Sequence, residues 1–221
     1  SNPMLSTALA GKNTAASLVM NPAEKLADEL KAQVLPRVTV QAVDAAARTV
    51  TLSSGDTLRY RDLVLALGAD QLRLPLQGDA ADTVVSVNDL DDFAAFADAL
   101  DKGPMGEPVQ RVAILGGGLI GCEFANDLLH REIKATVIDI AERALPRLLP
   151  PAASARLQKA LEAGGAAFRF GTSVTNIARG DGALRLTLSD GSTLDADLVV
   201  SAIGLKPRTE LAAQAGAELA R

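Results

Sequence analysis

The segment Gly116-Gly117-Gly118-Leu119-Ile120-Gly121 sets three glycines in a G-x-G-x-x-G pattern directly after the apolar run 112–115. Between a strand and a helix, the first glycine permits a tight turn and the second lets the backbone approach a pyrophosphate. The third lets helix and strand pack closely. The free N–H groups at the start of such a helix favour an anion. The segment therefore predicts a dinucleotide-binding turn, with the cofactor held by Gly116, Gly118, Leu119, Ile120 and Gly121.

Asp139 lies 23 residues after Gly116, at the end of the next apolar run. A carboxylate at this point of a βαβ unit accepts hydrogen bonds from the adenosine ribose and repels a 2′-phosphate, which favours NAD over NADP. Arg143 leaves two interpretations open. It could reach a 2′-phosphate, or it could pair on the surface with Glu142 or Asp139.

Composition and charge exclude several other functions. A net charge of −5 and a pI of about 5.0 disfavour a nucleic-acid partner, which needs clustered Lys and Arg. The longest apolar run is broken by glycines and falls short of the ~20 residues of a membrane span. The single cysteine, Cys122, excludes an internal disulfide and fits a reducing cytoplasm. His130 is the only histidine, and no metal-ligand cluster or nucleophile-base set is recognisable, so we expect no metal and no catalytic side chain.

The elements that must position these residues alternate along the chain. Strand 112–115, a helix to about residue 130 and strand 135–139 form a βαβ unit. The breaker-rich stretch 101–108 predicts a boundary between domains 1–101 and 109–221. The other predicted elements are helices at 22–35, 89–100 and 152–163, hairpins at 49–60 and around Asp190-Gly191, and strands at 38–43, 63–67, 166–170, 174–178 and 198–203.

The two halves of the chain repeat each other at a constant offset of 136 residues. Chance similarity between two hairpins is the alternative to duplication of a dinucleotide-binding domain. Duplication predicts an α/β fold of two related Rossmann-like domains, each with a hairpin insertion. The first is expected to be incomplete, because its glycine turn would lie upstream of Ser1. The matching residues are Thr51, Leu52, Ser53, Gly55, Thr57, Leu58, Val64, Ala66 and Gly68 with Thr187, Leu188, Ser189, Gly191, Thr193, Leu194, Val200, Ala202 and Gly204.

Four segments, 2–6, 63–68, 116–123 and 202–207, resemble the pyridine-nucleotide:flavin oxidoreductases, and within that family its rubredoxin-reductase branch. The resemblance covers essentially the whole chain and implies domains of the glutathione-reductase type. It also implies that Glu123 projects towards FAD and pairs there with a Lys or Arg before Pro3, where this sequence has Asn2. The remaining cofactor positions that it implies are Val40, Ala66, Gly68 and Gly204.

Each of these positions also has an ordinary interpretation. Glu123 could be a solvated carboxylate near a helix start, and Val40 or Ala66 could be plain sheet core. Thr7 stands where relatives that reduce peroxide or a coenzyme-A disulfide carry a redox cysteine, and a threonine forms no thiolate. Cys122 is expected to be buried and not to replace that cysteine.

The resemblance implies an FAD-dependent enzyme that passes electrons from NADH to a small iron protein such as rubredoxin. The alternatives are a non-catalytic NAD-binding module or redox sensor, or a reductase of the same family that acts on ferredoxin, nitrite, peroxide or a disulfide. A monomer or homodimer in the cytoplasm is expected, without nucleic acid or membrane as partner.

Overall fold

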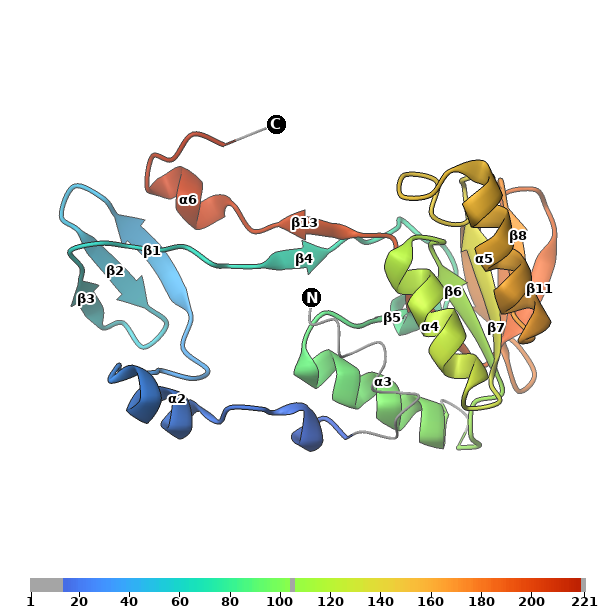
Figure 1. The fold of residues 1–221 in the computed structure, drawn as a ribbon, viewed down its shortest axis with the longest axis horizontal. Helices are drawn as coiled ribbons and strands as arrows, with labels where there is room; N and C mark the ends of the chain where they lie inside the picture. The colour runs from blue at the N-terminus through green and yellow to red at the C-terminus, as the bar shows by residue number, and fades with distance from the viewer. Residues whose placement is uncertain (1–13, 104–105, 220–221) are drawn as a thin grey trace. The chain divides into compact units, whose positions relative to one another are not determined.

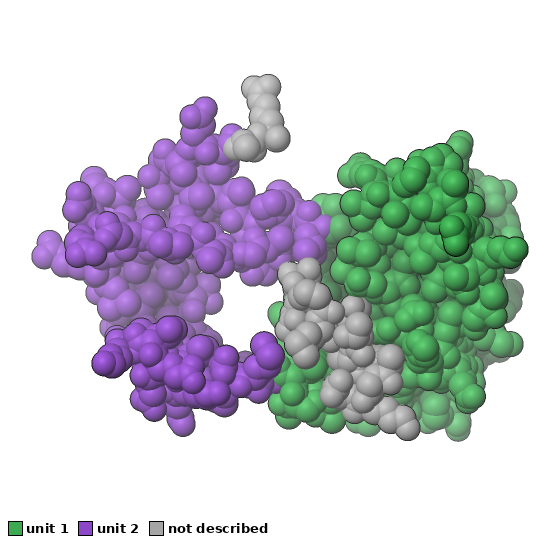
Figure 2. All heavy atoms as spheres, viewed as in Figure 1, with its two compact units in different colours: residues 1–18, 71–204 green, residues 19–70, 205–221 purple. Residues whose placement is uncertain are grey.

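The computed structural model describes residues 14–103 and 106–219. By its contacts the described chain divides into unit 1, residues 14–18 and 71–204, and unit 2, residues 19–70 and 205–219 (Figure 2). Residues 71–102 group with unit 1 because a strand and a helix within them join its sheet and core. The cofactor domains 1–101 and 109–221 stay a prediction.

Unit 1 contains a five-stranded parallel sheet in the order β5-β12-β6-β7-β8 (Figure 1). Its strands are β5 (Val85–Ser86), β12 (Leu198–Ser201), β6 (Arg111–Leu115), β7 (Lys134–Asp139) and β8 (Ala167–Phe170). The central strand β6 pairs Val112 with Leu198 on one side and with Ala135 on the other. The predicted α/β class and βαβ unit are confirmed.

The two faces of this sheet carry different layers. Alternate residues of β6 point to opposite faces. Val112 and Ile114 join a core with α3 (Leu90–Lys102) and α4 (Leu119–Leu129), in which Phe96 and Phe124 meet edge to face. Ala113 and Leu115 join a second core under the meander β9 (Val174–Arg179), β10 (Leu184–Leu188) and β11 (Thr193–Ala196). The carboxyl ends of the parallel strands thus lie between a helical layer and a β layer.

Helix α5 (Pro151–Ala163) extends the helical layer. Leu161 packs there with Cys122, Ala144 and Leu145. Short 3-10 turns at η1 (Ala16–Leu18) and η2 (Ala81–Thr83) complete unit 1. Every helix in the described ranges is too short or too polar to span a bilayer.

Unit 2 consists of small elements around a small core. They are α2 (Ala23–Leu30), the meander β1 (Val40–Asp44), β2 (Thr49–Leu52) and β3 (Thr57–Arg59), the paired β4 (Ala69–Gln71) and β13 (Leu205–Pro207), and α6 (Glu210–Gln214). Val43, Val50 and Leu52 pack with Leu211 and Ala215. The predicted strand 63–67 is wrong, because this segment pairs with no strand in the described part of the chain, and Val64 is 86% exposed.

Candidate functional site

Two glycines of the turn are required by the fold itself. Gly116 leaves β6 with φ +108°, and its N–H donates to the Ile138 carbonyl at 2.8 Å. A Cβ on Gly116 would lie 2.7 Å from the Ala202 carbonyl oxygen, and one on Gly121 only 1.9 Å from that of Gly116. Any larger residue at either position would push β6, β12 and α4 apart.

Packing within the protein does not require glycine at the third position. Gly118 caps the amino end of α4 with φ −75° and ψ −171°, which any residue adopts, and a Cβ there would meet no atom within 4 Å. The following N–H groups of the first turn have no acceptor within the helix, and that turn carries no acidic side chain. The turn thus presents an open, electropositive surface.

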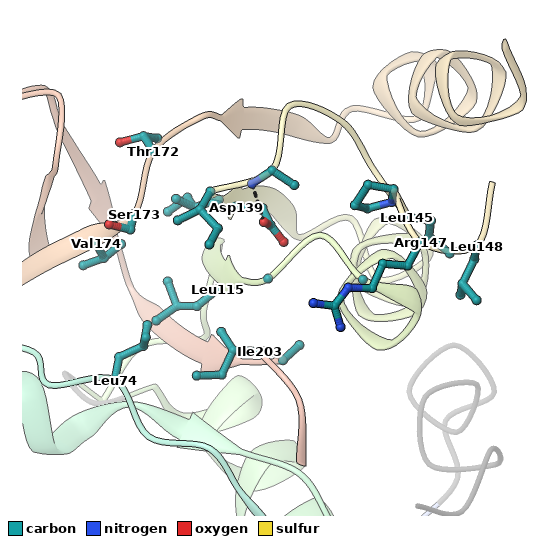
Figure 3. Close-up of a pocket in the computed structure, with 17 residues that line it drawn as sticks. Leu74, Leu115, Asp139, Leu145, Arg147, Leu148, Thr172, Ser173, Val174 and Ile203 are labelled. Carbon is teal, nitrogen blue, oxygen red and sulfur yellow. Dashed lines mark hydrogen bonds between the residues drawn. The ribbon is translucent and has the colours of Figure 1, made fainter. Parts of the chain in front are cut away.

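The carboxylate of Asp139 ties the turn to the loop that follows β7. Its Oδ2 accepts a hydrogen bond from the N–H of Gly117, and its Oδ1 accepts one from Ala141 at 2.7 Å (Figure 3). Each carboxylate oxygen has a second lone pair for another donor. Asp139 therefore shapes the site and also offers acceptors within it.

A cavity of about 810 Å³ opens between these groups at the carboxyl ends of the strands (Figure 3). This volume lies within the roughly 300–1,000 Å³ that is usual for small-molecule sites. Three predicted residues, Gly116, Gly118 and Asp139, line it. The other lining residues are Leu74, Leu115, Ile138, Ile140, Ala141, Leu145, Pro146, Arg147, Leu148, Thr172, Ser173, Val174, Ala202 and Ile203.

The remaining predicted residues of unit 1 do not line this cavity. Leu119 is half exposed at the start of α4, and Ile120 packs against the helical core. Arg143 donates from Nη2 to the Pro146 carbonyl at 3.3 Å, so its guanidinium braces the loop. Gly204 has φ +120° and accepts a hydrogen bond from Leu72 through its carbonyl. Glu123 is half-buried on the second turn of α4.

Three of the positions predicted to contact FAD belong to unit 2. In unit 2, Val40 is half-buried on β1, whereas Ala66 and Gly68 are exposed. Asn2 and Pro3, like Thr7, lie outside the described residues.

Two loops of the cavity were missed by the sequence analysis. Ile140, Arg147 and Leu148 follow β7, and Thr172 and Ser173 follow β8. Arg147 is the cation among the lining side chains, and Figure 3 shows its guanidinium extending from the loop into the cavity. Ligands of open α/β sheets bind at the carboxyl ends of the strands, so the ends of the predicted strands were the signal that could have found these loops.

Helix α4 carries two buried titratable groups, Cys122 beside the glycine turn and Asp127 near the carboxyl end of the helix. Burial, with smaller contributions from Asp139 and Glu123, raises the pKa of the Cys122 thiol to about 11. It is therefore no nucleophile near neutral pH. Burial also raises the pKa of Asp127 to about 6, and its Oδ2 has no hydrogen-bond partner among the described residues. Within the same residues, no group of three His, Cys, Asp or Glu side chains could hold a metal ion.

Comparison with known proteins adds independent evidence. A family model described as pyridine nucleotide-disulphide oxidoreductase matches residues 1–221. A rubredoxin-NAD(+) reductase from Alcanivorax borkumensis is 45% identical over 222 residues, covering 100% of this chain and 56% of that protein. A nitric oxide reductase FlRd-NAD(+) reductase from Aeromonas salmonicida is 36% identical and covers 99% and 54%. The chain spans about half the length of these curated relatives.

Solved structures show the same fold. The putidaredoxin reductase in a covalent complex with putidaredoxin matches with a TM-score of 0.85 at 31% identity, over 99% of this chain and 52% of that one. A ferredoxin reductase from Rhodopseudomonas palustris matches with a TM-score of 0.87 at 29% identity, over the same shares.

Proposed function

The chain belongs to the pyridine nucleotide-disulphide oxidoreductase family, and we propose that unit 1 binds NADH in a flavoprotein that uses FAD to reduce rubredoxin or another small iron protein. The naming of relatives at 45% and 42% identity as rubredoxin-NAD(+) reductases supports this choice of acceptor. The activity of the whole protein, its location in the cytoplasm and its state as monomer or homodimer are part of the same proposal.

The contrast among the glycines carries the proposal. Gly116 and Gly121 are needed for packing, whereas the space beside Gly118 is empty and opens on the cavity. The backbone conformation at Gly118 would allow any residue, so the conformation does not explain the glycine. A ligand that approaches the backbone closely would explain it. The amino end of α4 suits a pyrophosphate there.

Three groups of this chain would then hold NADH. The first-turn N–H groups of α4 bind the pyrophosphate, and Arg147 adds a cation from the loop that follows β7. Asp139 accepts hydrogen bonds from the adenosine ribose, and its charge disfavours the 2′-phosphate of NADPH. Binding in this way orients the nicotinamide, and orientation lowers the barrier to hydride transfer without an acid or base.

Bound FAD would supply the chemistry that links a two-electron hydride donor to a one-electron iron acceptor. Ala66 and Gly68 present exposed backbone in unit 2, where a flavin could lie along it. We propose that Val40, Gly204, Glu123, Asn2 and Pro3 also contribute to the flavin site. The pKa of Cys122, about 11, agrees with a reaction that needs no thiolate in this chain.

Substitution of Gly118 by alanine tests nucleotide binding. Gly118→Ala should unfold at the wild-type temperature, because its Cβ meets nothing, but should weaken NADH binding about tenfold or more by occupying the approach to the turn. Gly121→Ala is the contrast, since its Cβ overlaps the Gly116 carbonyl and should lower both stability and affinity. NADH fluorescence titration and thermal unfolding measure the two effects. Unchanged NADH affinity in Gly118→Ala would contradict the proposed site.

The full-length protein tests the flavin and the acceptor. It should be yellow, lose its flavin absorbance when NADH is added without oxygen, and regain that absorbance faster with rubredoxin than with a ferredoxin. A colourless protein that binds NADH would instead be a non-catalytic module. Faster reoxidation by the ferredoxin would show that rubredoxin is not the preferred acceptor, and it would not contradict the proposed NADH site.

A further inference from the structure

One wall of the cavity is a loop without regular secondary structure, residues 140–149. It presents Ile140, which is 76% exposed, Leu148, which is 63% exposed, and Arg147 to the cavity. Exposed aliphatic side chains that face a cavity have no partner in the protein and suit the flat face of a heteroaromatic ring. On the proposed function, this wall would contact the adenosine half of NADH.

A few hydrogen bonds fix the shape of this wall. The N–H of Leu145 donates to the Gly117 carbonyl at 2.9 Å, which fastens the loop to the glycine turn. Leu145 itself has φ +47°, a left-handed conformation that costs energy for a leucine and persists only where its surroundings hold it. A shift of the loop at Leu145 would therefore displace both the cavity wall and the glycine turn.

Ser154 supplies one of those holding contacts from outside the cavity. It lies on the first turn of α5, is fully buried, and donates from Oγ to the Ala144 carbonyl at 2.5 Å. Ala144 is also fully buried and directly precedes Leu145. Without the hydroxyl, the Ala144 carbonyl would lose this donor in a site that water does not reach, and the loop would relax to find another.

We propose that Ser154 is a positioning residue for the adenosine half of the dinucleotide. It touches no ligand and acts through the Ala144 carbonyl on Leu145, and through Leu145 on the cavity wall and the glycine turn. This inference rests on the proposed NADH site but concerns a residue on a different helix, outside the cavity.

The test measures ligand binding and turnover of Ser154→Ala in the full-length protein. We expect the Kd for NADH to rise about tenfold, since the loss of one buried hydrogen bond misplaces the wall. ADP-ribose, which keeps the adenosine and the pyrophosphate but lacks the nicotinamide, should lose affinity by the same factor. The kcat with saturating NADH and ferricyanide should stay within about twofold, because the nicotinamide half is not moved.

Three further variants separate positioning from general loss of stability. Ser154→Thr keeps the hydroxyl and should bind both ligands as the wild type does. Gln158→Ala, which removes an exposed hydrogen bond on the same helix, should change neither affinity. Asp197→Asn removes an ion pair at the opposite, amino-terminal edge of the sheet and should lower stability without changing the Kd.

The outcomes are distinguishable. Unchanged affinity in Ser154→Ala, equal weakening in Asp197→Asn, or binding by Ser154→Thr as weak as that by Ser154→Ala overturns the positioning role. Failure of the wild-type protein to bind either NADH or ADP-ribose overturns the proposed function itself.

Discussion

The two antiparallel meanders, one in each unit, share their local geometry and differ in what packs against them. In unit 2 Thr51 pairs with Thr57, and in unit 1 Thr187 pairs with Thr193, which is the same register at the offset of 136. Gly55 and Gly191 occupy the turns with φ +88° and +82°. The corresponding serines also accept the same hydrogen bond, from Thr39 to Ser53 and from Ser173 to Ser189.

Burial separates the two meanders. Leu186 on β10 is completely buried against the parallel sheet, together with Leu184, Leu188 and Ile177. Its counterpart Val50 on β2 meets only a small core, and every residue of β3 is exposed. Local sequence is therefore sufficient to specify the turn and register of a meander, whereas its burial depends on the layer that covers it.

The segments that follow the meanders show the same contrast. Residues 198–201 form β12 between β5 and β6, whereas the matching residues 62–65 form no strand within the described chain. An extended apolar segment becomes a strand only when neighbours satisfy its backbone groups. Residues 63–67 have no such strand neighbour within the described part of the chain.

The largest expected difference is between the matched core substitutions Leu186→Ala and Val50→Ala. Leu186→Ala should cost about 2–5 kcal/mol, because it leaves a cavity in a closed core. Val50→Ala should cost roughly 1–2 kcal/mol, because it removes two methyl groups from the small core of unit 2. Urea unfolding measures both. The only tyrosine, Tyr60, packs in the core of unit 2, so its fluorescence should move for Val50→Ala alone. Equal costs would show that the two meanders are covered equally.

The next largest difference in stability is expected between substitutions of Asp197 and of Arg61, which is its counterpart at the offset of 136 residues. Burial alone would raise the pKa of Asp197, but hydrogen bonds from Arg111 and the N–H of Gln110 outweigh it and hold this pKa below its usual value. Asp197→Asn should cost about 2–3 kcal/mol near neutral pH. Arg61→Gln should change stability by less than about 0.5 kcal/mol, because its ion pair with Asp62 is exposed.

The effect of Asp197→Asn should depend on pH. A carboxylate with a lowered pKa in the native state stabilises the fold above its unfolded pKa, and this contribution is lost as the pH falls below about 4. Unfolding curves for wild type and Asp197→Asn should therefore converge at acid pH. A cost that stays constant from pH 7 to pH 3 would mean that the charge does not contribute.

The smallest expected difference is between Gly204→Ala and Gly68→Ala. Gly204 has φ +120°, which alanine rarely adopts, so its substitution should cost about 2–3 kcal/mol. Gly68 has φ +69° in the ordinary left-handed region, where about 1–2 kcal/mol is expected. Thermal unfolding compares them. Because a Cβ on Gly68 would meet nothing within 4 Å, a larger cost there would contradict the ranking by φ.

The sequence predicted the parts of the fold that local patterns specify. The βαβ unit and both meanders follow from periodicity, turn residues and spacing, and these features are confirmed, whereas the cofactor contacts of the three glycines stay a prediction. The predicted helix 22–35 is too long, because Lys31 adopts a left-handed conformation and ends α2 at Leu30. The contacts that shape loop 140–149, from Ser154 and Gly117, join residues that only the folded chain brings together.

The burial of the chain's only thiol beneath the glycine turn makes the turn chemically observable. Cys122 Sγ lies 3.7 Å from the Gly117 carbonyl oxygen and is 6% exposed. A thiol reagent can reach this sulfur only when α4 and the turn separate. The rate of labelling therefore measures how often that local opening occurs. A bound dinucleotide should slow the labelling of Cys122 in proportion to its occupancy. The measurement needs no dye, tag or engineered residue.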